Sequence, residues 1–244
     1  MIILIGTGHV FNISQPLINI FEKNQPEIVC VELDKQRYKA LMLKRNDLEA
    51  YKKMERNVPI IYKILSRFQD GMAKEYGVTA GEEMVTAINY AQSHQLPVAF
   101  IDMNAQNLFT RMLKSMTISE KFKLFFSGFG GFFVNKKRVE MELSKIEGDF
   151  DHYIEEMGKK FPTIKRILID ERDRYMVQQL VSANEQYGKV AAVVGDGHIP
   201  GLQKLLSEKE VDYDTVRLSE LRNFKLEDSN LSSASFSLEY KGLE

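Results

Sequence analysis

Two histidines stand in the same local setting near opposite ends of the 244-residue chain. His9 follows the run MIILIGTG and His198 follows AAVVGDG, so each imidazole comes after an apolar stretch and a Gly-x-Gly turn. Two imidazoles with a carboxylate form a competent ligand set for a divalent metal and leave positions open for water and substrate. We therefore expect both histidines to face one site.

Acidic residues occupy equivalent places after two other apolar runs. Glu32 stands in EIVCVELD and Asp102 ends LPVAFID, at or just past the ends of two predicted strands. In an open parallel sheet, ligands gather beyond the carboxyl ends of the strands, where loops direct side chains into one crevice. Gly6 and Gly195 are supporting residues, since glycine lets the backbone swing each imidazole outward without a Cβ clash.

Glu83 is a further candidate from the stretch TAGEEM. Thr79 and Glu82 have capping-box spacing, which gives Glu82 a structural explanation. Glu83 then falls at the fourth helical position, where an apolar partner for Val78 is typical. A carboxylate there has no local structural role, so the pattern favours an active-site role for Glu83.

Arg172 and Asp173 lie in the charged stretch DERDRYM of a predicted helix. Most charge runs of this kind form a solvated face with ion pairs between successive turns. The alternative is a buried pair that orients the histidines, and the spacing alone does not decide between the two.

A dinucleotide site is the competing explanation of the glycine turns, but it fits poorly. The fingerprint G-x-G-x-x-G requires a third glycine for close helix packing. Phe11 holds that place when counting from Gly6, and Pro200 holds it when counting from Gly195.

The strands and helices predicted around these residues indicate an α/β fold. Short apolar runs at residues 2–6, 27–34, 96–102, 189–195 and 213–218 predict strands, separated by helical patterns. Ser14 is the expected N-cap of the first helix, and Thr117 with Glu120 forms a second capping box. We predict a mostly parallel central sheet flanked by helices in a single domain over 1–220. A long helical insertion over 104–160 separates the third and fourth strands, and 221–244 is a loosely ordered tail.

The composition excludes several classes of protein. The 33 basic and 34 acidic residues give a net charge of −1, which offers no electrostatic reason to expect nucleic acid as a partner. No run reaches the roughly 18 apolar residues of a spanning helix, and no signal peptide is visible. We expect a cytoplasmic protein, with Cys30 as a small buried hydrophobe.

The segment FKLFFSGFGGFF, residues 122–133, holds six phenylalanines and three glycines. Its plain interpretation is a loop packed under the helical insertion. The alternatives are a flap over substrate, a peripheral membrane contact, or a surface for self-association into a dimer.

Six words of the chain together resemble the TraB/PrgY family of pheromone-shutdown proteins: LIGTGHV, VCVELDKQRYKAL, GEEMVTAI, FIDMNAQNLFTRM, IKRILIDERDRYM and VVGDGHIPG. That family belongs with the TIKI proteases and is related to the ChaN and erythromycin-esterase folds. The resemblance runs from Met1 to about Leu206. It implies a metal-dependent hydrolase of small peptides, with manganese or cobalt favoured and zinc as an alternative. Many relatives carry membrane-spanning helices after this domain, and this chain stops without them.

The resemblance also implies roles for matching positions. The metal ligands would come from His9, His198, Glu32 and Glu83, and the other matched positions are Asp102, Arg111, Arg172 and Asp173. We expect one glutamate to bind the metal and the other to act as general base. Arg172 or Arg111 would stabilise the oxyanion or grip a peptide carboxylate. The alternative is a protein of the same fold that sequesters a peptide or haem-like ligand without turnover, which has little need of Glu83.

Overall fold

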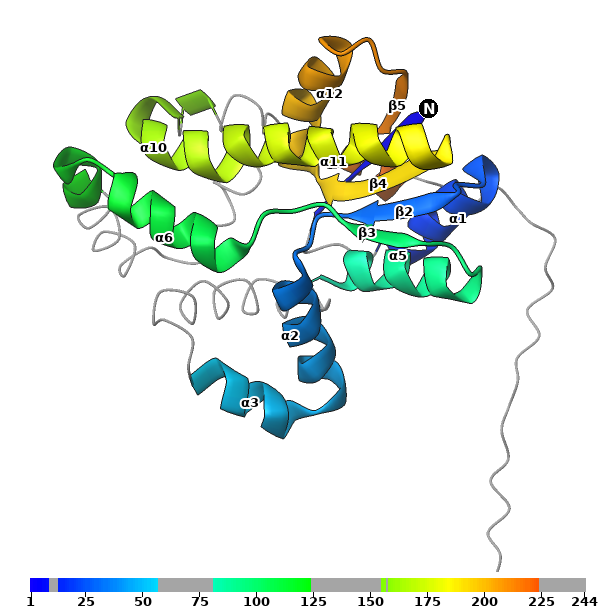
Figure 1. Ribbon diagram of the computed structural model, residues 1–244, viewed down its shortest axis with the longest axis horizontal. Helices are drawn as coiled ribbons and strands as arrows, with labels where there is room; N and C mark the ends of the chain where they lie inside the picture. Colours follow the sequence, from blue (N-terminus) through cyan, green and yellow to red (C-terminus); the bar gives the residue numbers. More distant parts are fainter. Residues whose placement is uncertain (9–12, 57–80, 124–154, 157, 224–244) are drawn as a thin grey trace, which may run out of the picture.

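A computed structural model describes residues 1–8, 13–56, 81–123, 155–156 and 158–223 of the chain. A five-stranded, all-parallel sheet stands at its centre with helices on both faces, which confirms the predicted α/β fold (Figure 1). The strand order is β3-β2-β4-β1-β5. The strands are β1 (Ile2–Thr7), β2 (Ile28–Val31), β3 (Val98–Phe100), β4 (Val190–Gly195) and β5 (Tyr213–Val216).

The strands are continuous apolar runs because helices cover both faces of the sheet. The side chains of successive residues point to opposite faces, and both faces are buried. Every residue of β1 and β2 is buried. Ile3 and Ile5 of β1 pack in one core with α1 (Ser14–Asn24) and α5 (Glu82–Ser93). Ile2 and Leu4 pack in the other core with α11 (Glu171–Tyr187) and α12 (Ile199–Ser207).

Two predicted helix starts are wrong. The N-cap of α1 is Ile13, and Ser14 is instead the first helical residue, with its hydroxyl 3.0 Å from that of Thr86 in α5. The start of α5 is also later than expected, because Gly81 is its N-cap with φ of 82°. Thr79 lies outside the described residues.

A carboxylate in the first turn of a helix is stabilised by the helix dipole, so the position of Glu83 now has a structural explanation as well.

The second capping box, within the predicted insertion, is confirmed. Thr117 N–H donates to Glu120 Oε2 at 2.8 Å, and Glu120 N–H donates back to Thr117 Oγ1 at 3.2 Å. Glu120 Oε1 also accepts a hydrogen bond from Thr163 N–H at 2.8 Å. This single carboxylate therefore connects the segment after α6 (Ala105–Ser115) to α10 (Pro162–Lys165). Of the phenylalanine-glycine segment, all but residues 122 and 123 lie outside the described part.

The remaining helices are α2 (Lys35–Asn46), α3 (Leu48–Arg56) and α13 (Leu218–Asn223). A π-helical turn, Arg166–Asp170, joins α10 to α11, and a 3-10 turn, Asp196–His198, joins β4 to α12. Leu221 of α13, the first residue of the predicted tail, is 1% exposed and belongs to the core. Among the described residues, no helix has the length and apolar character needed to cross a bilayer.

The strand order brings the candidate residues to one edge. β2 lies between β3 and β4, so the segments that leave the carboxyl ends of these three strands are neighbours. Glu32 follows β2 directly, Asp102 follows β3 after one residue, and His198 closes the turn after β4.

Candidate functional site

Glu32 lies at the centre of this edge and is 8% exposed. It continues the row of β2 residues, including Cys30, that faces the α11 side of the sheet. Gly195, the last residue of the neighbouring strand, donates its N–H to Glu32 Oε2 at 2.6 Å. A Cβ at position 195 would lie 3.3 Å from the same oxygen, so glycine permits the close approach.

Arg172 connects the segments after β2 and β3 through one guanidinium group. Its Nε and Nη2 each donate to the Asp102 carboxylate at 2.9 Å, and its Nη2 also donates to Glu32 Oε1. Its Nη1 donates to the Leu168 carbonyl oxygen, within the π-helical turn, at 3.1 Å. The side chain is 13% exposed and each of its three nitrogens donates at least one hydrogen bond, so the protein holds Arg172 in place.

His198 is buried between two carboxylates. Its Nδ1 lies 2.5 Å from Asp173 Oδ1, and its Nε2 lies 3.4 Å from Glu32 Oε1. Asp173 reaches the imidazole from α11 because Gly201 of α12 leaves room for it, since a Cβ at position 201 would lie 2.0 Å from Asp173 Oδ2. We call the five residues Glu32, Asp102, Arg172, Asp173 and His198 the edge cluster.

The charges of the edge cluster depend on one another. Burial alone would raise the pKa of Glu32, but the charges of His198 and Arg172 and the hydrogen bonds from His198 and Gly195 hold it well below its usual range. Burial alone would lower the pKa of His198, but the Glu32 charge and the Asp173 hydrogen bond raise it to about 9. Burial raises the pKa of Asp173 by more than its contact with His198 lowers it. These shifts favour an imidazolium that faces the Glu32 carboxylate in the metal-free protein.

In metal-free protein we expect the His198 ring to titrate near pH 9. Since an unperturbed histidine has a pKa of about 6.5, the imidazolium stabilises the fold fully below that pH, and this contribution is lost as the pH rises through 9. Imidazole ¹⁵N chemical shifts followed between neutral and alkaline pH measure this directly. A His198 ring already neutral at pH 7 would contradict the charge state described above.

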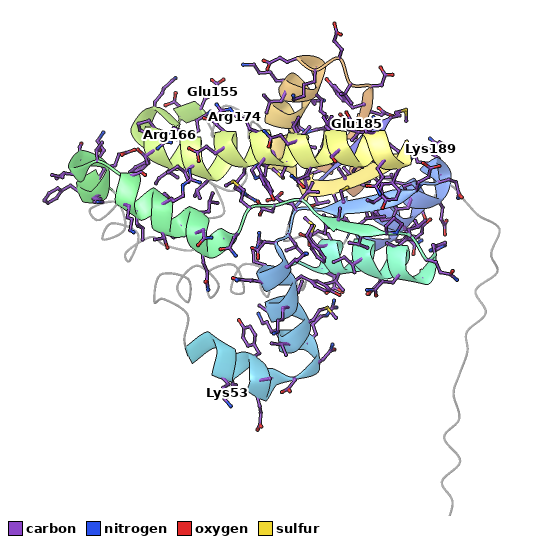
Figure 2. The ribbon with its side chains drawn as sticks, in the orientation of Figure 1. Lys53, Glu155, Arg166, Arg174, Glu185 and Lys189 are labelled. Carbon is purple, nitrogen blue, oxygen red and sulfur yellow. The ribbon has the colours of Figure 1, made fainter. Side chains whose placement is uncertain are left out.

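Two predicted site residues lie apart from the edge cluster. Glu83 is 2% exposed in the first turn of α5, in the helical layer on the other face of the sheet from α11. Arg111 of α6 forms an ion pair with Glu171, and Arg166 binds the same carboxylate at 2.6 Å. Arg166 lies on the outside of the molecule, with 51% of its side chain exposed (Figure 2).

Two contacts were not predicted from the sequence. Asp196, inside the Gly-Asp-Gly-His turn, accepts hydrogen bonds from Arg217 Nη2 at 2.8 Å and from Leu218 N–H at 2.9 Å. A Cβ at Gly6 would lie 2.2 Å from Asp196 Oδ1, so Gly6 serves this packing. Arg37 Nη1 donates to Asp102 Oδ2 at 3.2 Å. The position of Asp196 between the two glycines of its motif is a sequence signal that could have pointed to the contact of Asp196 with Arg217. No sequence signal indicates the contact between Arg37 and Asp102.

The first histidine of the predicted pair, His9, lies outside the described residues. Within the ranges that the structure describes, no group of three or more histidine, cysteine or acidic side chains is arranged to hold a metal ion. The edge cluster supplies two donors that face each other, His198 Nε2 and Glu32 Oε1. Catalytic zinc sites use three protein ligands, so at least one more would be required.

The chain is similar to known proteins over most of its length. The profile of the TraB/PrgY/gumN family matches residues 1–214. An uncharacterized protein of Methanocaldococcus jannaschii is 30% identical, over 92% of this chain and 58% of that protein. TraB domain-containing proteins of Bos taurus and Mus musculus are 22% and 21% identical, each over 82% of this chain and 61% of the relative. The chain thus spans less than two thirds of the length of these relatives.

Proposed function

Because the chain belongs to the TraB/PrgY/gumN family, we propose that its edge cluster is the centre of a metal-dependent hydrolase acting on small peptides. The observation that carries the proposal is the buried His198 ring, held by Asp173 at Nδ1 and facing the Glu32 carboxylate with Nε2. A histidine whose second ring nitrogen donates to a carboxylate is the usual arrangement of a metal-ligating histidine.

These donors suit a divalent ion. His198 and Glu32 would bind the metal, His9 is the third ligand assigned from the sequence, and manganese or cobalt is favoured, with zinc as the alternative. A bound divalent metal supplies Lewis acidity, which polarises a peptide carbonyl and lowers the pKa of a water molecule. Asp173 orients His198, and its hydrogen bond fixes which ring nitrogen faces Glu32.

The structure favours different roles for the two glutamates. Both oxygens of Glu32 accept hydrogen bonds, from Arg172 and from Gly195, so Glu32 is better suited to hold a charge than to accept a proton. We assign it as a ligand. Glu83 remains the candidate general base, since α5 begins at the same edge of the sheet. Arg172 is a positioning residue that holds Glu32 and Asp102, and Arg111, which is paired with Glu171, takes no part in the proposed mechanism.

The alternative is a protein that binds a peptide without cleaving it. The finding in its favour is that the described residues supply two facing donors rather than a complete ligand set.

A random peptide pool separates the two functions. With manganese, the protein is expected to release shorter products detectable by mass spectrometry, and a chelator is expected to stop their release. Cleavage that persists in chelator would contradict metal dependence, and peptides that stay intact in both conditions yet bind the protein would establish the alternative.

A further inference from the structure

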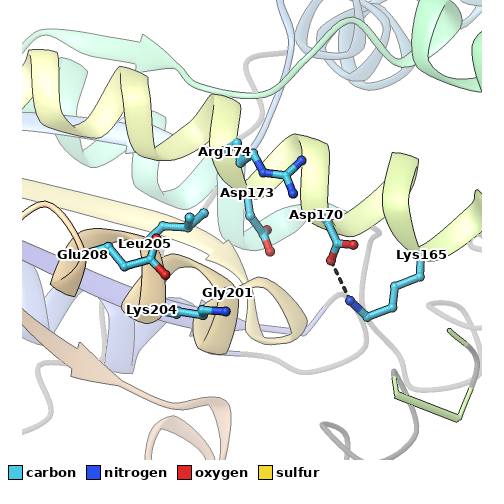
Figure 3. A pocket seen from close by; sticks show the side chains of 8 residues that line it. All are labelled: Lys165, Asp170, Asp173, Arg174, Gly201, Lys204, Leu205 and Glu208. Atoms are coloured by element: carbon cyan, nitrogen blue, oxygen red, sulfur yellow. Dashed lines mark hydrogen bonds and ion pairs between the residues drawn. The ribbon is translucent and has the colours of Figure 1, made fainter. Parts of the chain in front are cut away.

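A groove of about 390 Å³ lies between α11 and α12, beside the edge cluster (Figure 3). It is lined by Lys165, Asp170, Asp173, Arg174, Gly201, Lys204, Leu205 and Glu208. Ligand pockets of proteins span roughly 300–1,000 Å³, so the groove has room for a small molecule or the end of a peptide. Of the residues that line the groove, only Asp173 belongs to the edge cluster.

Asp173 connects the groove to His198. Its side chain points into the space between the two helices (Figure 3). Its Oδ1 is bound to His198 Nδ1. Its Oδ2 accepts no hydrogen bond from the described residues. Asp173 is one of the residues that line the groove, so its carboxylate borders both the groove and the edge cluster. The groove therefore offers an acceptor on a carboxylate whose residue is only 3% exposed.

The other charges of the groove leave a cationic excess. Lys165 is neutralised by Asp170 at 2.6 Å, and Asp173 is matched by His198. Arg174 of α11 and Lys204 of α12 form no ion pair in the part of the chain that the structure describes, and both are exposed. Glu208 also lines the groove, so the unmatched charges are two positive and one negative.

We propose that this groove binds the carboxyl terminus of a short peptide. The terminal carboxylate lies between Lys204 and Arg174, the last peptide N–H donates to Asp173 Oδ2, and the last side chain covers Leu205. A carboxylate bound by two cationic side chains makes charge-assisted hydrogen bonds, which are about twice as strong as neutral ones. This inference rests on the proposed function for its choice of a peptide, and it extends that function by naming the end of the peptide that is recognised.

Equilibrium dialysis of the metal-free protein against a random tripeptide pool tests the proposal, with the same pool amidated at its carboxyl end for comparison. We expect the amidated pool to bind at least about 10-fold more weakly, because amidation removes the negative charge of both charge-assisted contacts. Lys204→Met and Arg174→Met are each expected to weaken binding of the free-acid pool by a similar factor. Lys209→Met removes an exposed lysine that does not line the groove, and it is expected to change nothing.

Three results would overturn the proposal: equal binding of the two pools, equal binding by the Lys204 and Lys209 variants, or full displacement of the peptides by an equal concentration of inorganic phosphate. Failure of the proposed function is read separately, from cleavage of the same pool with manganese. Discrimination between acid and amide without cleavage would leave the groove assignment intact, and cleavage without discrimination would refute the groove assignment alone.

Discussion

Replacement of Arg172 by methionine is expected to lower the free energy of unfolding by about 3–5 kcal/mol, because it removes the buried cation that two buried carboxylates share. Arg172 donates to both Glu32 and Asp102, whose residues are 8% and 6% exposed. Such a loss is a large part of the roughly 5–15 kcal/mol that stabilises a typical domain. Urea denaturation followed by circular dichroism gives the measurement.

Arg166→Met is the matched control, since Arg166 binds Glu171 on the surface with 51% of its side chain exposed. Exposed ion pairs contribute about 0–1 kcal/mol, so this variant is expected to unfold nearly as wild type does. If Arg172→Met does not fold, Arg172→Lys provides the comparison, because it keeps the charge and loses the paired geometry. Equal unfolding free energies for the Arg172 and Arg166 variants would show that Arg172 does not hold the two carboxylates.

The second large effect concerns peptide cleavage. Loss of a carboxylate that supports a metal-bound histidine typically lowers metal affinity or activity by about 10–100-fold, and we expect Asp173→Asn to lower kcat/KM within that range. His198→Ala removes the ring itself and is expected to cost more than Asp173→Asn. Both values come from initial rates on one cleaved peptide at saturating manganese.

Arg111→Met provides the comparison variant, because Arg111 pairs with Glu171 and its side chain is 49% exposed. Most surface substitutions change stability by about ±0.5 kcal/mol or less, so the variant is expected to stay folded. Because Arg111 takes no part in the proposed mechanism, we expect its kcat/KM to stay within about a factor of two of wild type. A His198→Ala protein with undiminished cleavage would remove the edge cluster from the mechanism. A large loss in Arg111→Met would restore the role first assigned to Arg111 from the sequence.

The arrangement of the sheet was predictable because its signals are local. Apolar runs that end in glycine or an acid predict buried parallel strands, and the carboxyl ends of such strands meet at one edge. Glu32, Asp102 and His198 are therefore found where the sequence predicts them. Their neighbouring positions in the sheet were not predictable, because the order β3-β2-β4 depends on pairing between strands far apart in the sequence.

The stretch DERDRYM shows why the rest could not be predicted. Its period does not reveal which charges point inward, since that depends on the π-helical turn just before it. Glu171 binds Arg111 and Arg166 at the surface, whereas Arg172 and Asp173 enter the edge cluster. The stretch therefore contains both a surface ion pair, at Glu171, and a buried pair, at Arg172 and Asp173.

The start of α5 was mispredicted for a related reason. Gly81 adopts a positive φ as the N-cap of the helix, so the helix begins at Glu82 whatever the spacing of Thr79 and Glu82 suggests. Glu83 consequently occupies the second position of the helix and not the fourth.

Manganese binding to protein stripped of metal tests the central claim most directly. Isothermal titration is expected to find one ion bound per chain in wild type and in His94→Ala, which removes an exposed histidine at the end of α5. The same titration is expected to find no such site in His198→Ala or Glu32→Ala. Unchanged manganese affinity in the His198 and Glu32 variants, or no binding by wild type, would show that the edge cluster holds no metal.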